Sequence, residues 1–431
     1  MTRAFDPEGP AVLLASADSV FTSLLARDWL NRGQKVKVIT IGERVNGLPD
    51  DVEVIDVRQR LSFIRKAIGY FGGSIAAAVQ KAFVHQHRHS FQRITGKDSV
   101  DDWEWNIFPP WLHAPVLAAT ALTFRPRFVF GQEAMMYGRA TALCHNVPRI
   151  LFPWGSDIYN APESWWGADW FIGSGLRGID LIVPSAVCGA RHLIDRFRID
   201  PKSVQSISWG LDVNELDSRT EFQREAVYRT WNLPTNIPIV LNARRFRRQW
   251  GSDTVLAAFI RAAKECPYSH FVIVAGPGAA DTVAAANLTI AENGLHSRFT
   301  LIDRQVSVDE YNALASVANV FVSLTFRGDM RSSSVLQCAG CGGAPVIGDA
   351  CEYRYMALLG FDAEFVPSRN AERVAEAIVE LLKSPQRQQE MRLRNRAYLR
   401  KFENREQLFD RLYSEIEQIV ARYADGSNHS S

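Results

Sequence analysis

The stretch from Arg327 to Arg354 reads RGDMRSSSVLQCAGCGGAPVIGDACEYR and gathers residue types that bind phosphate. Ser332, Ser333 and Ser334 follow an apolar run, VFVSLTF, and precede a run of small residues that predicts a helix. The first turn of a helix exposes unpaired backbone N–H groups and carries a partial positive charge, so it can bind a diphosphate. Serine also caps helices with nothing bound, and that alternative remains open.

Basic side chains follow another expected strand, IVLN, in the segment ARRFRRQWG. Guanidinium groups bind phosphate oxygens in bidentate fashion, so this cluster is a second candidate for phosphate binding. A solvated charged face is the alternative. The four arginines are Arg244, Arg245, Arg247 and Arg248.

Two further candidates follow apolar runs in the same half of the chain. Gly276 opens the sequence GPG after HFVIVA, where glycine allows a close backbone approach to a ligand but a tight turn explains it equally well. Arg304 follows FTLID and is a further candidate for binding the same ligand.

The elements that position these residues alternate between apolar runs and amphipathic segments. In the first half, AVLLASADS, VFTSLLARDWLNRG and KVKVITIG form an expected strand, helix and strand, and RFVFG, RILFPWG and LIVPS continue the pattern. The second half repeats it from Ile239 onward. Such alternation predicts two doubly wound parallel sheets flanked by helices, with ligands bound at the carboxyl ends of the strands.

The length and composition agree with two globular domains. The chain has 431 residues, 47% of them hydrophobic and 22% charged, and a formal net charge of +2, which argues against a nucleic-acid binder. The six cysteines suit a reducing compartment. We expect no secretory signal and no membrane-spanning helix, and hence a cytoplasmic protein.

Three cysteines lie close together in the sequence, but we do not expect a metal site. Cys338, Cys341 and Cys351 offer a C-x2-C pair and a third thiol, and no fourth ligand lies nearby. Small buried cysteines in a helix are the simpler interpretation.

The order of these motifs over residues 11 to 420 resembles the GT-B glycosyltransferases, and within them the retaining family 4. The segment ARRFRRQWGSDTV is similar to the family's Gly-Arg-Leu-x3-Lys-Gly motif, with Arg245 and Gly251 at the matching positions, and GAPVIGD resembles its Gly-x-Pro-Val-Ile ending. ILFPWGSDIY resembles the strand that carries His-Gly-x-Asp, and VQSISWGLDV resembles the Asn-Gly-Val-Asp turn before the linker.

The resemblance implies a nucleotide-diphosphate sugar as the donor, UDP- or GDP-linked, with no metal and no other cofactor. The donor would lie mainly on the second domain and the acceptor on the first, across a cleft. The implied donor contacts are Arg244, Arg245, Arg247, Arg248, Gly276, Arg304, Ser332, Ser333, Ser334 and Gln337. For catalysis we select Asp329, Arg245 and Asp157; Asp157 and Glu133 could orient the acceptor, although a structural role is the stronger interpretation of both.

Several positions depart from the family pattern. The Glu-x7-Glu pair becomes Asp329 and Gln337, or Cys338 if the alignment shifts by one residue. The family lysine falls at Trp250 and the family histidine at Trp154. Glutamine still forms hydrogen bonds and aspartate keeps its charge, so we favour an altered but working site.

The favoured function is transfer of a sugar to a saccharide or lipid-linked acceptor, with retention at the anomeric carbon, in the synthesis of a cell-envelope polysaccharide. The alternative is an inactive GT-B protein that binds a nucleotide or glycan as a partner subunit. A GT-B epimerase or phosphorylase is a third interpretation, and the latter is disfavoured because no pyridoxal-phosphate lysine motif is evident.

The expected domain boundaries follow from the pattern changes. Residues 1–215 form the acceptor-side domain, 216–236 the linker, and 237–400 the nucleotide-sugar domain. Residues 401–424 form a helix that returns to the first domain, because Leu408, Leu412, Ile416, Ile419 and Tyr423 share one face. Residues 425–431 are expected to be disordered.

Residues 57–97 contain eight Lys or Arg and no Asp or Glu, interleaved with aromatic and aliphatic side chains. Such a segment suits the surface of an anionic bilayer, which predicts peripheral binding at the inner face of the membrane; a basic outer face of ordinary helices is the alternative.

Overall fold

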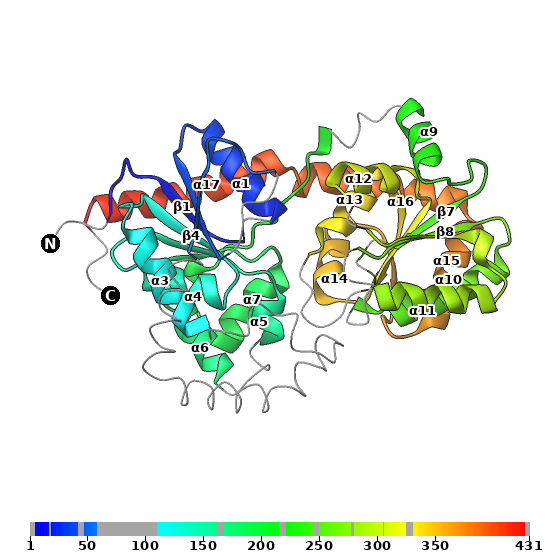
Figure 1. The fold of residues 1–431 in the computed structure, drawn as a ribbon, viewed down its shortest axis with the longest axis horizontal. Helices are drawn as coiled ribbons and strands as arrows, with labels where there is room; N and C mark the ends of the chain where they lie inside the picture. Colours follow the sequence, from blue (N-terminus) through cyan, green and yellow to red (C-terminus); the bar gives the residue numbers. More distant parts are fainter. Residues whose placement is uncertain are drawn as a thin grey trace. The chain divides into compact units, whose positions relative to one another are not determined.

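The computed structural model describes residues 5–16, 19–41, 47–57, 110–161, 167–214, 221–242, 244, 246, 250–276, 280–304, 306–324 and 331–426. These residues form two compact units, each built on a six-stranded parallel sheet (Figure 1). Unit 1 comprises residues 1–207 and 409–431, and unit 2 comprises residues 208–408. The two doubly wound sheets predicted from the sequence are therefore confirmed.

The sheet of unit 1 has the strand order β3-β2-β1-β4-β5-β6. The chain reverses its direction of winding between β1 and β4, which pair directly. The strands are β1 (Ala11–Leu14), β2 (Val36–Thr40), β3 (Glu53–Asp56), β4 (Phe128–Gln132), β5 (Arg149–Phe152) and β6 (Leu181–Ile182). The helices are α1 (Val20–Asn31), α3 (Pro110–Leu122), α4 (Met136–Leu143), α5 (Ser156–Tyr159), α6 (Ala168–Leu176) and α7 (Val187–Phe197), with a 3-10 turn at Pro201–Ser203.

The central strands β1 and β4 are buried on both faces of the sheet, and apolar residues make up most of both strands. On one face, Val12 and Val129 pack against α3 and α4. On the other face, Trp29 of α1 lies edge-on against Phe128 and Phe130, with ring centroids 5.0 and 5.4 Å apart. This alternation along each strand fixes which side of the sheet each connection covers.

The sheet of unit 2 repeats the topology in the order β12-β11-β10-β7-β8-β9. Its strands are β7 (Ile239–Asn242), β8 (His270–Val274), β9 (Phe299–Ile302), β10 (Val320–Ser323), β11 (Ala344–Gly348) and β12 (Glu364–Val366). Its helices are α9 (Glu221–Thr230), α10 (Ser252–Glu265), α11 (Ala280–Glu292), α12 (Val308–Val317), α13 (Ser333–Cys341), α14 (Cys351–Leu358), α15 (Ala371–Leu382) and α16 (Pro385–Phe402), with a 3-10 turn at His296–Arg298.

Two hydrophobic cores cover the two faces of this sheet. One joins Val240, Val320 and Val322 to α10, α11 and α15. The other joins Leu241 and Phe321 to α9, α12, α13 and α14. The segment 216–236, which the sequence suggests as a linker, contains α9 and lies within unit 2.

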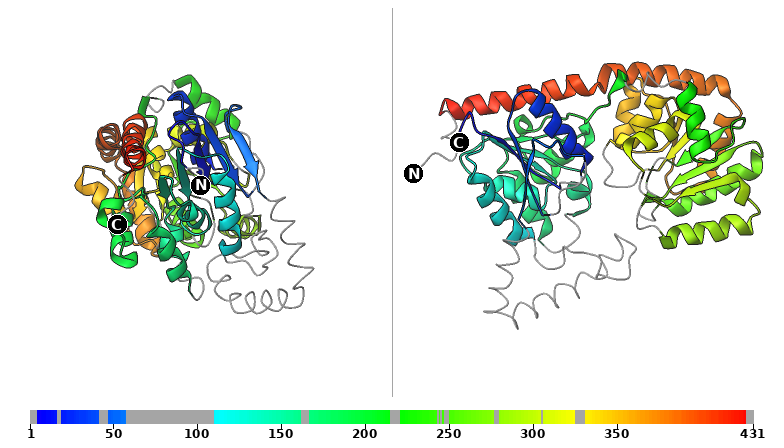
Figure 2. Two further views of the ribbon diagram at one scale, coloured as in Figure 1. Left: turned by 90° about the vertical axis from the view of Figure 1, so that its left-hand side faces the viewer. Right: turned by 45° about the horizontal axis from the view of Figure 1, so that its top comes forward.

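The last helix, α17 (Arg405–Ala424), begins in unit 2, and from residue 409 onward it belongs to unit 1. It runs beside α1, where Arg32 Nη2 lies 2.6 Å from Asp410 Oδ1 (Figures 1 and 2). Further along the helix, Arg127 Nη2 lies 2.6 Å from Glu417 Oε2. Of the predicted apolar stripe, Leu412, Ile416 and Ile419 are buried, whereas Leu408 and Tyr423 are half-buried. Phe409 and Val420 complete the buried face.

Within the described part of the chain, no helix combines the length and apolar character that crossing a bilayer requires.

Candidate functional site

The strongest candidate site in unit 2 lies where its sheet reverses winding, between β7 and β10. These strands pair directly, with Asn242 opposite Val322. Arg244 follows β7, and its Nη1 donates to the carbonyl oxygen of Leu324 at 3.4 Å, just beyond β10. Its guanidinium carbon also lies 5.7 Å from the centre of the Trp250 ring. Arg244 is therefore held at the carboxyl edge of the sheet, where such folds bind ligands.

Helix α13 begins at the same edge, directly after β10 and its connection. Ser332, the residue before its first turn, has an extended backbone and makes no side-chain capping hydrogen bond. Its Oγ instead lies 2.8 Å from Ser334 Oγ, and its N–H donates to the hydroxyl of Tyr353 at 3.2 Å. The side chain of this serine thus caps none of the first-turn amides of the nine-residue helix, although the Val335 N–H donates to the Ser332 carbonyl oxygen at 3.1 Å. A helix start without a side-chain cap suits an anion.

Two buried polar side chains end the strands on either side of this switch point. Asn242 is 3% exposed and Ser323 is fully buried. Among the described residues, Asn242 Oδ1 and Ser323 Oγ have no hydrogen-bond partner. Buried polar atoms are normally satisfied, so an unpartnered pair at a ligand-binding edge is a signal for a bound polar group.

The structure distinguishes the two positions that could align with the second glutamate of the family that the sequence resembles. Gln337 is half-buried, one turn into α13. Cys338 is fully buried, its Sγ lies 3.3 Å from Tyr311 Oη, and burial raises the pKa of its thiol. Gln337 is therefore the residue of the two that remains accessible to a ligand.

The other two described candidates of unit 2 lie farther along its edge. Gly276 follows β8 with a φ of 75°, a left-handed conformation that favours glycine. Arg304 follows the edge strand β9, where its guanidinium contacts both carboxylate oxygens of Glu310 at 2.6 and 3.2 Å. It also lies 4.7 Å from the centre of the Trp231 ring. These contacts hold Arg304 two strands away from the switch point.

Several residues singled out by the sequence lie outside the described part of the chain. They are Arg245, Arg247, Arg248, Asp329, nearly all of the basic segment 57–97, and residues 427–431 of the tail.

In unit 1, Glu133 follows β4 at the corresponding edge. Its φ of 94° is unusual for a residue with a side chain, and such strain concentrates at functional sites. Its carboxylate accepts hydrogen bonds from the N–H groups of Met136 and Tyr137, at 2.9 and 3.4 Å, at the start of α4. Burial and the nearby Asp157 carboxylate raise the pKa of Glu133 to about 8, against the lowering effect of these hydrogen bonds.

Asp157 is 4% exposed and serves as an acceptor for the backbone. It accepts from the N–H groups of Ala134 at 2.6 Å, Trp154 at 3.0 Å and Gly155 at 2.8 Å. Burial raises its pKa, and the three hydrogen bonds oppose that rise. Asp157 thus ties the connection after β4 to the connection after β5, which positions Glu133 as well.

Trp154, which aligns with a histidine of the family that the sequence resembles, belongs to a small aromatic group at this edge. Its ring centroid lies 5.1 Å from that of Phe21 and 5.9 Å from that of Phe152. The indole is half-buried, so part of its surface remains available for stacking on a sugar ring or an acyl group.

Sequence reasoning missed Arg331, which directly precedes the serine run. Its side chain is only 9% exposed and binds two buried carboxylates, Glu352 and Glu403. The available signal was weak, because these partners lie 21 and 72 residues further along the chain.

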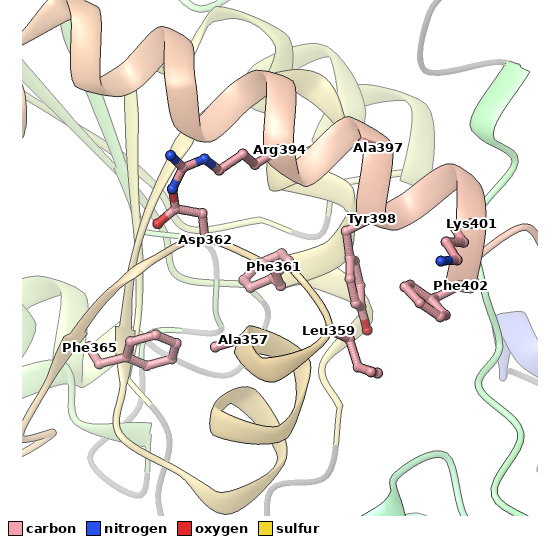
Figure 3. A pocket seen from close by; sticks show the side chains of 11 residues that line it. Ala357, Leu359, Phe361, Asp362, Phe365, Arg394, Ala397, Tyr398, Lys401 and Phe402 are labelled. Carbon is pink, nitrogen blue, oxygen red and sulfur yellow. The ribbon is translucent and has the colours of Figure 1, made fainter.

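A hollow of about 600 Å³ lies between α14, α16 and the segment that leads into β12 (Figure 3). Its wall includes Phe361 and Tyr398, and Asp362 forms an ion pair with Arg394 at 3.0 Å. This hollow lies toward the amino end of β12, whereas α13 begins at the carboxyl ends of the parallel strands. We assign it no part in the candidate site.

Within the described residues, no group of three or more His, Cys, Asp or Glu side chains is arranged to hold a metal ion. Cys338 contacts Tyr311, and the thiol of Cys341 lies 3.7 Å from the carbonyl oxygen of Asn312.

No protein-family model and no curated protein sequence matches this chain. Solved structures match it over nearly its whole length. A glycosyltransferase from Rickettsia africae has a TM-score of 0.70 at 13% identity, covering 96% of this chain and 99% of its own. Sucrose-phosphate synthase from Thermosynechococcus elongatus has a TM-score of 0.68 at 13% identity, covering 96% and 99%.

The Anabaena protein HepE, solved in complex with UDP, has a TM-score of 0.66 at 11% identity, covering 95% of this chain and all of its own. These likenesses establish that the chain has the GT-B fold that its sequence suggests.

Proposed function

We propose that the protein is a glycosyltransferase that binds a nucleotide-diphosphate sugar at the carboxyl edge of the unit 2 sheet. The observation that carries the proposal is the uncapped start of α13 at the same sheet edge as Arg244, together with the unpartnered polar atoms of Asn242 and Ser323. Backbone amides and a guanidinium are ligands for a diphosphate, and buried polar side chains suit the hydroxyl groups of a donor. HepE was crystallised with UDP and with UDP-glucose, which supports a uridine nucleotide as the first donor to test.

We further propose that transfer proceeds with retention at the anomeric carbon and without a metal ion. The acceptor oxygen bonds to the anomeric carbon as the bond from that carbon to the β-phosphate oxygen breaks. The leaving diphosphate takes the acceptor proton, so the chain supplies position and charge stabilisation rather than a general base. Arg244 and the first-turn amides of α13 are the described groups for that task, and Arg245, Arg247 and Asp329 remain candidates.

The acceptor side belongs to unit 1 in this proposal. Glu133, raised in pKa and held by Asp157, supplies a hydrogen-bonding group, and Trp154 supplies an aromatic face. A saccharide or lipid-linked acceptor of cell-envelope polysaccharide synthesis fits this pair of features. The basic segment 57–97 would then hold the protein at the inner face of an anionic membrane. Equal binding to neutral and anionic vesicles in a flotation assay would contradict the proposed membrane binding.

The competing function is an inactive GT-B subunit that binds a nucleotide or glycan. Gln337 in place of a glutamate, and tryptophans at the family's lysine and histidine positions, favour it.

Thermal unfolding against UDP-, GDP- and ADP-sugars, each also followed for release of nucleoside diphosphate, separates these functions. A ligand at about 100 times its Kd stabilises by roughly 2.7 kcal/mol, which raises the Tm of one unit by roughly 5 to 10 °C. A shift with release supports the transferase and names its nucleotide. A shift without release, with saccharide and lipid-linked acceptors present, supports the binding subunit. No shift with any donor contradicts the transferase and the nucleotide-binding subunit, and leaves the subunit that binds a glycan.

A further inference from the structure

Arg331 lies at the centre of a buried ionic cluster in unit 2. Its Nε donates to Glu352 Oε1 at 3.0 Å, its Nη2 contacts the same oxygen, and its Nη1 contacts Glu403 Oε1. The carboxylates of Glu352 and Glu403 are 2% and 0% exposed. Separating the charges of such a cluster would leave an uncompensated buried charge, which costs much free energy. The three side chains are therefore held in place.

One side of this cluster is the start of α13. Arg331 is followed immediately by Ser332, whose N–H donates to the hydroxyl of Tyr353. Glu352 and Tyr353 are neighbours in α14, so two successive residues before α13 are anchored to one helix. The direction of the first turn of α13 is therefore set by these contacts.

The other side of the cluster is Glu403, which follows α16. Its carbonyl oxygen accepts from the N–H of Leu211 at 2.7 Å, and the N–H of Arg405 donates to the carbonyl oxygen of Leu211 at 2.9 Å. Gly210 makes this approach possible: its φ is 58°, and a Cβ there would lie 2.8 Å from the Glu403 carbonyl oxygen. We call the paired segments 209–211 and 403–405 the bridge.

Both passages of the chain between the two units lie beside the bridge. The chain enters unit 2 at Ser208 and leaves it after Leu408, each three residues from a hydrogen-bonded residue of the bridge. Tyr398, whose ring lines the hollow described above (Figure 3), donates to Glu403 Oε1 at 3.2 Å and reinforces the same carboxylate. Glu403 thus binds the start of α13 with its side chain and the bridge with its backbone.

We propose that the cluster of Arg331, Glu352 and Glu403 couples the first turn of α13 to the bridge. Arg331 is a positioning residue that acts through Glu403. This proposal rests on the function proposed above: a diphosphate that orders the first turn of α13 also orders both connections between the units. Such a coupling free energy is reciprocal: a change at the first turn of α13 affects the bridge, and a change at the bridge affects the first turn of α13 to the same extent.

The test is hydrogen exchange on the full-length protein, read at two sets of amides. The bridge is read at Leu211 and Arg405, and the first turn of α13 at Val335 and Leu336, whose N–H groups donate to the Ser332 carbonyl oxygen. Without ligand, Glu403→Gln keeps the carbonyl acceptor but removes the ionic contact. We expect Glu403→Gln to speed exchange at Val335 and Leu336 by about fivefold or more. We expect Arg331→Met to speed exchange at Leu211 and Arg405 by a similar factor.

Tyr398→Phe is the matched control, because it removes the hydrogen bond that a neutral hydroxyl donates to the same oxygen and leaves both ion pairs. We expect it to leave exchange at α13 close to that of the unchanged protein. If Arg331→Met does not fold, the double variant Arg331→Met, Glu352→Gln replaces it, since it buries one charge fewer and leaves Glu403 of the bridge unchanged. Unchanged exchange at the distant set of amides in the folded variants overturns the coupling.

A second arm adds UDP. We expect saturating UDP to slow exchange at Leu211 and Arg405 in the unchanged protein and in Tyr398→Phe, but not in Glu403→Gln with UDP bound. Equal slowing in Glu403→Gln, or none in the unchanged protein with UDP bound, overturns the proposal. If UDP does not bind at all, GDP and ADP are used in turn; failure of all three contradicts the proposed function, while the ligand-free arm still decides the coupling.

Discussion

Glu133 has a strained backbone, and its carboxylate is shielded from solvent and lies near the carboxylate of Asp157. In the folded protein its pKa is about 8, compared with 4.5 for an ordinary glutamate. Between these values the folded state holds a proton that the unfolded state releases. The free energy of unfolding therefore falls as the pH rises from about 4.5 to about 8.

Glu133→Gln removes this titration and keeps an oxygen that can accept from the start of α4. We expect the variant to gain stability relative to the unchanged protein as the pH rises. The gain between pH 5 and pH 8 should be on the order of 2 kcal/mol, because each pKa unit corresponds to about 1.36 kcal/mol and solvent screens part of it. Urea unfolding at four pH values measures it, and parallel pH profiles for both proteins would contradict the raised pKa.

Arg244 and Arg304 offer a comparison between two arginines at the same edge of one sheet. Arg244 lies at the switch point, whereas Arg304 is held by Glu310 beside the edge strand. We expect Arg244→Gln to weaken nucleoside-diphosphate binding by about ten- to a hundredfold, because a hydrogen bond to a charged group contributes about 1.5–3 kcal/mol. Calorimetric titration measures it, with Arg304→Gln as the control; equal losses in the two variants would place the diphosphate elsewhere along the edge.

At the scale of elements, α13 places its first-turn amides at the proposed diphosphate site. Ser333 is its first residue, and Ser332 before it has the extended backbone (φ −79°, ψ 124°) that a following proline requires. Proline is well tolerated at the first helical position, so Ser333→Pro removes one N–H donor and preserves the helix.

We expect Ser333→Pro to lower diphosphate affinity by on the order of tenfold at nearly unchanged Tm. Ser333→Ala removes the hydroxyl and retains the N–H, so it separates the side chain from the backbone. Equal losses of affinity in the proline and alanine variants would show that the serine hydroxyl, and not the helix amide, binds the anion.

Apolar runs and their alternation with helices were sufficient to predict both sheets, because strands of a parallel sheet are buried on both faces. The same local signals predicted a helix after the serine run and the amphipathic stripe of α17. They could not predict the positive φ of Glu133 or the three amides gathered by Asp157. Nor could they predict the burial of Arg331, since its carboxylate partners come from distant parts of the chain.

At the scale of the whole molecule, the chain passes between the units twice, and α17 completes unit 1 from the far end of the sequence. Its contacts with unit 1 include Arg127 with Glu417, and Tyr423, whose hydroxyl donates to Asp180 Oδ2 at 2.9 Å. The stability of unit 1 therefore depends on residues that follow unit 2 in the sequence.

This dependence predicts that the same core truncation, isoleucine to alanine, will destabilise unit 1 when made in α17 and unit 2 when made in α15. Ile416 of α17 and Ile378 of α15 are both fully buried, the first in unit 1 and the second in unit 2. Truncating a buried isoleucine to alanine costs about 2–5 kcal/mol. In calorimetry we expect Ile416→Ala to lower the transition of unit 1 and Ile378→Ala to lower that of unit 2. Because the proposed donor site lies in unit 2, UDP should raise only the transition that Ile378→Ala lowers. A transition lowered by Ile416→Ala and raised by UDP would show instead that the nucleotide binds unit 1 or that the two units unfold as one.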